Sequence, residues 1–401
     1  MSGRTGEVVA EPRTDRLGPP PGLSTVLVEW GRIGCIGFGG PPTHIALLRA
    51  LCVERKRWIA AHDFEDAIAA CNLLPGPAST QLAIYCAWRM RGRVGALVGG
   101  LAFIVPGLIL ILALAVLFLS GSPPLWVKGA GAGAGSAVAA VAVQAGSTLI
   151  PASWQRAHGH SRRRWALYLA AGAAAAATLG PWLVLVLLAC GAIELTVRGA
   201  LRGSSGLTVL APLPLLGATT VAGGGVIALA WVAFKVGALS YGGGFVIIPL
   251  MQADAVSHYH WMTDAQFLNA VALGQVTPGP VVQTVAVVGY AADGITGGLL
   301  AALVAFSPSF AFILLGGDRF DRIRRDPRAR TFLDGAGPAA IGAILGSAIP
   351  LARALTQPWQ YAILAAAAAM LLALRRGVVP TLLCAAAAGA VIAIAGGSLP
   401  R

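Results

Sequence analysis

The chain has 401 residues, of which about 57% are apolar and only 11% are charged. A soluble protein of this length carries charges at about a quarter of its positions, so a mean hydropathy of +0.75 excludes an ordinary water-soluble fold. At about 20 apolar residues per crossing, the apolar residues allow on the order of eleven membrane crossings. The apolar stretches are continuous rather than alternating, which excludes an outer-membrane barrel. We therefore expect an all-α polytopic membrane protein.

The net charge is +13. In a membrane protein such a surplus reports orientation before it reports a partner, so we expect no nucleic-acid binding. The six cysteines form no CxxC pair and lie mostly in apolar stretches, where cysteine behaves as a small hydrophobe. We expect no disulfide framework, no metal site and no cofactor. Residues 1–22 are rich in Gly, Pro and charge without an apolar h-region, and this composition predicts a disordered cytoplasmic tail rather than a signal peptide.

Two halves of the chain repeat each other. The Phe-Gly-Gly motif at residues 38–40 matches the Tyr-Gly-Gly motif at 241–243 with an offset of 203 residues, and the same offset matches Pro-Gly-Pro at 75–77 with Pro-Gly-Pro at 278–280. An alignment without gaps over roughly 80 residues also pairs Trp58 with Trp261, Gly95 with Gly298 and Phe103 with Phe306. We predict an N-terminal repeat at 23–200, a linker crossing at 201–225 and a C-terminal repeat at 226–401.

The apolar segments follow the same division. Full crossings are expected at 94–119, 129–150, 165–179 and 181–197, and again at 295–316, 333–352, 359–374 and 377–397. Segments 23–56, 64–91, 226–257 and 267–293 are interrupted by Gly and Pro motifs. Broken backbone in lipid is tolerated only where protein or a cavity satisfies it, and matched breaks in two repeats indicate a binding site. With the linker the total is about 13 membrane segments.

Charged loops predict the orientation. Basic clusters at 49–57, 89–93 and 156–164 place these loops in the cytoplasm by the positive-inside rule. The equivalent early loops of the second half carry Asp254, Asp264 and Asp293 without Lys or Arg, so they should be outside. The two repeats are then inverted, with the N-terminus cytoplasmic and the C-terminus outside.

Two readings of segment 64–91 are open. Basic residues flank both of its ends. A re-entrant hairpin that turns at 72–77 keeps both ends in the cytoplasm, whereas a kinked span puts Arg55, Lys56 and Arg57 outside.

These motifs resemble the chromate ion transporter (CHR) family in its two-domain, long-chain form. The resemblance rests on GFGGP at 37–41, Trp58, LPGP at 74–77, YGGG at 241–244 and TPGPVV at 277–282. It implies two oppositely oriented halves and efflux of chromate across the cytoplasmic membrane, which confers chromate resistance. The second half departs from the first by having Gly244 where Pro41 stands.

Chromate is a tetrahedral dianion whose oxygens only accept hydrogen bonds, so its site needs donors and positive potential. A helix that starts after each Pro-Gly-Pro motif presents backbone N–H groups and a positive dipole end, and glycine lets backbone approach an ion closely. The candidate substrate-binding residues are Phe38, Gly39, Gly40, Tyr241, Gly242, Gly243, Gly244, Pro75, Gly76, Pro77, Pro278, Gly279, Pro280, Thr80, Gln81, Gln283 and Thr284. The alternative is that these motifs only kink and pack helices, as expected for Gly131 with Gly135 and for Gly342 with Gly346.

Two cations are aligned by the 203-residue offset, Arg32 and Lys235. A cation inside an apolar segment costs about 2.5 to 3.5 kcal/mol, so both are candidates for attracting the dianion. Alternatively, Arg32 pairs with Glu29 and Lys235 snorkels to the interface. Glu29 and His44 are the candidates for proton coupling, and a structural hydrogen-bonding role is the alternative for His44.

We therefore expect a secondary transporter that exports chromate by alternating access, through movement between inverted repeats. A carrier of sulfate or another oxyanion, or a passive anion channel, are the alternatives. No enzyme is expected, because HExxH, GxSxG and paired Asp motifs are absent from the sequence. The expected partners are chromate or a related oxyanion and the lipid bilayer, and the sequence leaves a homodimer open.

Overall fold

The computed structural model describes residues 17–71, 76–119, 121–157, 159, 161–178, 183–199, 225–240, 246–316 and 326–400. Every regular element in these ranges is helical. The α-helices are α1 Leu23–Ile36, α2 Pro41–Arg49, α3 Ala61–Cys71, α4 Ala78–Leu119, α5 Leu125–Arg156, α6 Ser161–Thr178, α7 Leu183–Val197, α9 Val226–Leu239, α10 Ile247–Gln252, α11 Asp264–Val276, α12 Thr284–Gly316, α14 Pro327–Arg353, α15 Pro358–Ala368 and α16 Val378–Ile394. Pro75, Tyr241 to Gly244 and most of the predicted linker crossing lie outside the described ranges.

Among the described residues, four helices are long and apolar enough to cross a membrane: Ala78–Leu119, Leu125–Arg156, Val281–Gly316 and Pro327–Arg353. Shorter apolar helices cover Leu183–Val197, Val226–Leu239, Pro358–Ala373 and Val378–Ile394. The predicted full crossings therefore coincide with helices to within a few residues. Large aliphatic side chains such as Ile109, Leu303, Leu315 and Ile394 are largely exposed, which is unfavourable in water but suits contact with lipid.

Helices α4 and α12 break at equivalent points. Arg91 and Gly92 leave the helical conformation in α4, with Gly92 at φ +59°. Asp293 and Gly294 do the same in α12, with Gly294 at φ +60°. Only glycine adopts this conformation without strain, and in each case the helix resumes after the break.

These breaks correct the predicted register. Gly92 corresponds to Gly294, and the intrahelical Pro106 to Pro308, so the offset after the Pro-Gly-Pro motif is 202 residues. The alignment without gaps is therefore wrong beyond that motif. The second copy begins with a 3₁₀ turn at Val281–Gln283 where the first begins directly as α-helix. Three residues at about 2.0 Å rise cover the same ~6 Å as four at 1.5 Å, which absorbs the missing residue.

Segment 61–90 folds as a hairpin. Helix α3 has 11 residues, and the part of α4 before its break is similarly short, so at about 1.5 Å per residue each falls well short of the ~30 Å hydrocarbon core. Asp63 is near the start of α3, and Arg89 is near the end of the first part of α4. The Asp63 Oδ2 lies 4.0 Å from the Arg89 Nη2. The segment therefore enters and leaves on the same side of the fold.

The stretch before α1 ties this hairpin to the preceding loop. The Gly18 N–H donates to the Arg57 carbonyl at 2.9 Å, and the Arg91 guanidinium donates to the Pro21 carbonyl. Both basic clusters that flank the hairpin thus contact one short segment. This part of the predicted tail, residues 17–22, is bound to the fold, whereas residues 1–16 lie outside the described ranges.

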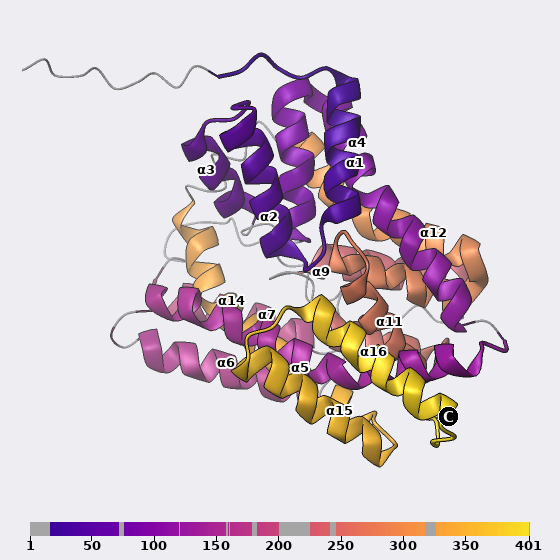
Figure 1. Ribbon diagram of the computed structural model, residues 1–401. Helices are drawn as coiled ribbons and strands as arrows, with labels where there is room; N and C mark the ends of the chain where they lie inside the picture. Colours follow the sequence, from indigo (N-terminus) through magenta and orange to yellow (C-terminus); the bar gives the residue numbers. More distant parts are fainter. Residues whose placement is uncertain are drawn as a thin grey trace, which may run out of the picture.

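The two repeats exchange helices. Helix α5 of the first repeat packs along α15 and α16 of the second, α14 of the second packs along α6 and α7 of the first, and α5 also packs against α14. In Figure 1 the yellow α15 and α16 accordingly lie beside α5. We call α5–α7 with α14–α16 the outer layer, and α1–α4 with α9–α12 the hairpin core.

Glycines allow these close approaches. Gly133 lies against the backbone of Gly389 in α16, and Gly342 and Gly346 lie against the backbone of α6. Gly131 and Gly135 instead face α11 of the hairpin core, where a Cβ would meet the Asn269 and Leu268 side chains. The predicted close packing at both small-residue pairs is confirmed.

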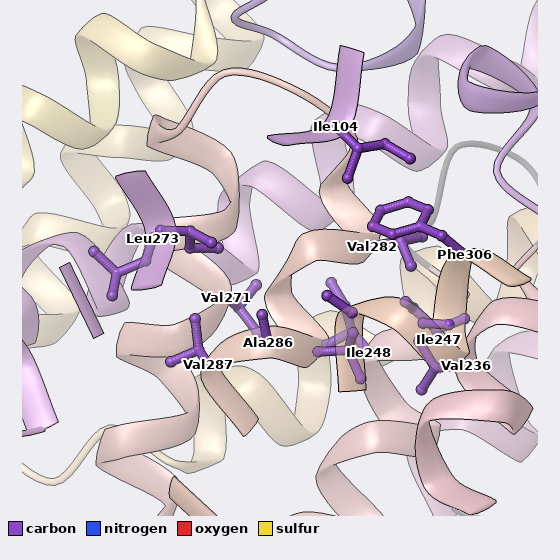
Figure 2. Close-up of a cluster of buried hydrophobic side chains, with 14 of the residues drawn as sticks. Ile104, Val236, Ile247, Ile248, Val271, Leu273, Val282, Ala286, Val287 and Phe306 are labelled. Atoms are coloured by element: carbon purple, nitrogen blue, oxygen red, sulfur yellow. The ribbon is translucent and has the colours of Figure 1, made fainter. Parts of the chain in front are cut away.

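An apolar cluster from both repeats supports the second Pro-Gly-Pro motif. Figure 2 shows Ile104 of α4 above Val282 and Phe306, with Ile247 and Ile248 of α10 below them. All five are buried. Their packing holds the backbone that follows Pro280 in place, which is what a site made of main-chain groups requires.

Candidate functional site

One backbone hydrogen bond links each Pro-Gly-Pro motif to the residue at the start of the glycine motif of the other repeat. The Gly76 N–H donates to the Ser240 carbonyl at 2.7 Å, and the Gly279 N–H donates to the Gly37 carbonyl at 3.0 Å. Both donors and both acceptors are related by the 203-residue offset. The motifs that sequence comparison paired are therefore brought together in space, crosswise between the repeats.

Both motif glycines have a backbone conformation that other residues avoid. Gly76 has φ +121° and Gly279 has φ +101°. A Cβ on Gly76 would lie 2.5 Å from the Gln81 Nε2 and 3.3 Å from the Ser309 Oγ. Glycine is thus needed here both for its torsion angle and for the close approach of α12.

The second motif has matching surroundings. The Gln283 Nε2 donates to the Ile104 carbonyl of α4 at 2.8 Å, and a Cβ on Gly107 would collide with the Pro278 carbonyl. With the corrected register, Gln283 corresponds to Gln81, and Ser309 to Gly107. The amides of Gln81 and Gln283 therefore occupy equivalent places, each beside its own Pro-Gly-Pro glycine.

Several buried polar atoms around the two motifs have no hydrogen-bond partner within the described ranges. They are the Thr80 Oγ1, the Ser240 Oγ, the Gln283 Oε1 and the Ser309 Oγ. Leaving such a group unsatisfied costs about 1 to 3 kcal/mol, so a cluster of them indicates a place for a polar ligand. Thr284 differs, because its hydroxyl donates to the Val281 carbonyl at 2.8 Å.

Sequence comparison missed Ser240, Ser309 and Gly107. Ser240 precedes the Tyr-Gly-Gly motif and corresponds to Gly37, so the repeat could have indicated it. Ser309 and Gly107 each follow an intrahelical proline, and that signal becomes visible only in the corrected register.

His44 joins the two motifs. Its Nε2 lies 2.8 Å from the Gly37 carbonyl, which can only accept, so Nε2 carries the hydrogen. Its Nδ1 lies 3.3 Å from the hydroxyl of Ser79, two residues after the first Pro-Gly-Pro motif. The ring is fully buried and contacts the Phe103 ring edge-on. Glu29, the other residue predicted for proton coupling, is half-buried on α1.

The remaining glycines of the first glycine motif lie beside Val281, which follows the second Pro-Gly-Pro motif. Gly39 and Gly40 have φ +97° and +74°, and a Cβ on Gly40 would contact Val281 at 3.7 Å. Phe38, by contrast, is exposed. The glycines of this motif therefore lie next to the backbone that follows Pro280.

The two aligned cations have different surroundings. The Lys235 Nζ lies 2.8 Å from the Asp254 Oδ2, and both side chains are 1% exposed. Snorkelling of Lys235 to the interface is therefore wrong. Asp254, expected in an external loop, is buried in the π-helical turn Ala253–His258, and its placement on the outer side stays a prediction. Arg32 is exposed on α1, and within the described ranges no ion pair links it to Glu29. Of these two cations, Lys235 is therefore the one with a buried positive charge.

Comparisons with known proteins agree with this architecture. The family model described as chromate transporter matches residues 24–195 and 227–393, one segment for each repeat. The chain belongs to the chromate transporter family. It is accordingly a multi-pass membrane protein and a transporter rather than an enzyme.

Curated relatives match over most of their length. A chromate transport protein of Cupriavidus metallidurans is 32% identical over 345 residues, 82% of this chain and 83% of the relative. A chromate transport protein of Pseudomonas aeruginosa is 29% identical over 355 residues, with 85% and 83% covered. An uncharacterized transporter of Methanocaldococcus jannaschii is 24% identical over 364 residues, with 86% and 87% covered. No solved structure matches the chain.

Proposed function

We propose that this protein exports chromate across the cytoplasmic membrane by alternating access and thereby confers chromate resistance. The observation that carries the proposal is the crosswise pair of hydrogen bonds from Gly76 and Gly279. Around them lie buried polar atoms that have no partner among the residues that the structure describes. Chromate supplies only acceptors. The hydroxyls of Thr80, Ser240 and Ser309 can each donate to it, as can backbone N–H groups near the Pro-Gly-Pro motifs.

The positive charge for the dianion comes from Lys235 in this proposal. It is buried on α9, five residues before Ser240. At about 1.5 Å per residue, its Cα lies roughly 7.5 Å along the helix from Ser240, so the two residues are near the same end of α9. Arg32 is exposed on α1, and we assign it the role of attracting the anion toward the site before binding.

The proposed topology places the hairpin 61–90 in the membrane as a re-entrant segment that opens to the cytoplasm. Its support is that Arg57 and Arg91 contact one short segment, Gly18 to Pro21, so the two basic clusters share a side. The positive-inside rule makes that side cytoplasmic. The second repeat is then inverted, with the N-terminus cytoplasmic and the C-terminus outside.

Because helices of each repeat pack against the other repeat, this packing restricts which parts of the protein can move relative to one another. Movement of one repeat as a rigid body against the other would separate α5 from α15 and α16, and α14 from α6 and α7. These contacts are extensive, whereas the outer layer meets the hairpin core mainly through α5 and α11. We therefore assign alternating access to movement of the hairpin core against the outer layer rather than of repeat against repeat. A homodimer stays a prediction.

Export of a dianion is favourable without further coupling in a cell that is negative inside. Moving two charges through about 100 mV releases roughly 4.6 kcal/mol. The driving force therefore does not by itself require a coupled ion. Whether one moves with chromate depends on buried titratable groups.

The test is uptake of labelled chromate into inverted vesicles, with sulfate as competitor. We expect saturable uptake that a potential accelerates. Ser309→Ala should raise the KM for chromate several-fold, while Ser307→Ala is the matched control because its exposed hydroxyl bonds the Val304 carbonyl of its own helix. Preferred uptake of sulfate would indicate a sulfate carrier, and flux that does not saturate would indicate a channel. Either result overturns the proposal.

A further inference from the structure

A fully buried ion pair stands in only one of the two repeats. Lys235 of α9 faces Asp254, which lies in the π-helical turn Ala253–His258 after α10. At the 203-residue offset, their counterparts are Arg32 and Leu51. Arg32 is exposed and Leu51 is buried. The backbone fold that the two repeats share therefore forms in the first repeat without an ion pair at this place. The shared fold does not explain why the second repeat has one.

The pair is poorly supported by its surroundings. Apart from their contact with each other, neither the Lys235 Nζ nor the Asp254 carboxylate oxygens have a hydrogen-bond partner in the described part of the chain. Buried ion pairs are favourable only when additional hydrogen bonds satisfy the remaining donors and acceptors. The Lys235 ammonium is therefore available to another anion, and the Asp254 carboxylate is available to another cation.

The charged groups near Asp254 are few. Lys235 faces it from α9, and His258 at the end of the same π-helical turn lies close enough to act on its charge. Helix α11 contributes Asp264, which accepts a hydrogen bond at 2.9 Å from the neutral Gln252 of α10. If Lys235 turned away, no other lysine or arginine of these packed helices would neutralise Asp254.

We propose that Lys235 and Asp254 form a site at which chromate and one proton bind together. The dianion replaces Asp254 as the partner of the Lys235 ammonium. The carboxylate left behind takes up one proton from water and becomes a neutral carboxyl, because an unpaired charge in this environment is neutralised rather than kept. When chromate leaves, Asp254 releases the proton to water and pairs with Lys235 again.

The proposal rests on the proposed function and adds its coupling ion. Each turnover would carry one chromate and one proton in the same direction, with a net charge of minus one instead of minus two. Low pH would favour chromate binding, because the proton and the anion bind together and their linkage is reciprocal. With one proton per anion, affinity should rise up to tenfold for each unit by which the pH falls while Asp254 is ionised in the empty protein.

Proton uptake on binding is the direct test. Chromate is added to the purified full-length protein in detergent, in weak buffer with a pH-indicator dye, at a pH high enough that chromate itself stays deprotonated. We expect about one proton taken up per chromate bound. Asp254→Asn should bind chromate at least as well, take up no proton and lose the pH dependence. Asp264→Asn is the matched control, because it removes an exposed carboxylate of the same repeat, and it should keep the uptake.

A second variant distinguishes loss of the binding site from loss of folding. Replacing both partners, with Lys235→Met and Asp254→Leu, restores the apolar residue found at Leu51 and should fold, but chromate affinity should fall at least tenfold. Proton uptake that persists in Asp254→Asn, or wild-type affinity in the double variant, would overturn the inference. Chromate binding to the wild type without proton uptake would overturn this inference alone. No chromate binding at all would overturn the proposed function as well.

Discussion

Replacing Gly76 by alanine tests whether the crosswise backbone contacts form the transport site. Gly76 has φ +121°, a region that is open to glycine and costs other residues about 1 to 3 kcal/mol. The added methyl group would also lie 2.5 Å from the Gln81 Nε2 and 3.3 Å from the Ser309 Oγ. The backbone can relieve this strain by turning away from Ser240, which breaks the 2.7 Å hydrogen bond.

The magnitude follows from these two terms. The variant either keeps the torsional strain, about 1 to 3 kcal/mol, or relieves it and loses the hydrogen bond, about 0.5 to 1.5 kcal/mol. If as little as about 1.4 kcal/mol of this falls on the substrate-bound state, kcat/KM for chromate drops tenfold. We therefore expect transport by Gly76→Ala to fall at least tenfold.

Gly92→Ala is the matched control. Gly92 also has a positive φ, +59°, but a Cβ there meets nothing within 4 Å. Both variants should lower the melting temperature of the purified protein, and Gly76→Ala should lower it more, because only there does the Cβ meet other atoms. Only Gly76→Ala should lose chromate uptake in vesicles when uptake is corrected for the amount of folded protein. Equal uptake by the two variants would refute the assignment of the site to the Gly76 turn.

Three further changes test other parts of the structure. Gln283→Leu leaves the buried Ile104 carbonyl without its donor, so denaturation should show a loss of about 1 to 3 kcal/mol and chromate affinity should fall; unchanged affinity would remove the amide from the site. Glu194→Gln weakens the paired hydrogen bonds from Arg164 at 2.8 and 3.0 Å. The melting temperature should fall while the KM for chromate stays unchanged. A changed KM would contradict a purely structural role for Glu194. Single cysteines at positions 57 and 91 should react with an impermeant maleimide from the same side of the membrane, and reaction from opposite sides would exclude the hairpin.

The glycine and proline motifs could be predicted because their geometry is local. A positive φ needs glycine, and a helix start tolerates proline, wherever the chain folds this way. Two copies at one offset then indicated that Gly76 and Gly279 have equivalent roles. For the hairpin, the positive-inside rule favoured placing Arg57 and Arg91 on one side of the membrane, but a kinked span stayed open until the structure brought Asp63 beside Arg89.

Other features depend on contacts that no local pattern contains. The register shift after Pro280 follows from a single 3₁₀ turn, and Ala, Leu and Val repeat too often there to reveal one missing residue. The exchange of α5 and α14 depends on where distant helices dock, since small residues allow close packing without specifying a partner. The burial of Asp254 beside Lys235 was hidden because a loop carboxylate normally indicates exposure.

The two repeats share a backbone frame but differ in their buried ionisable side chains. His44 has Ile247 at its equivalent position, and the pair of Lys235 and Asp254 has Arg32 and Leu51. In an inverted repeat, exchange of the two halves' conformations turns the inward-facing state into the outward-facing one. With identical halves the site would have the same chromate affinity on both sides. In the proposed inverted topology, the unequal side chains would make the two affinities differ, which would change the rates of loading and release. Net direction still follows the gradients of chromate, charge and any proton that moves with it.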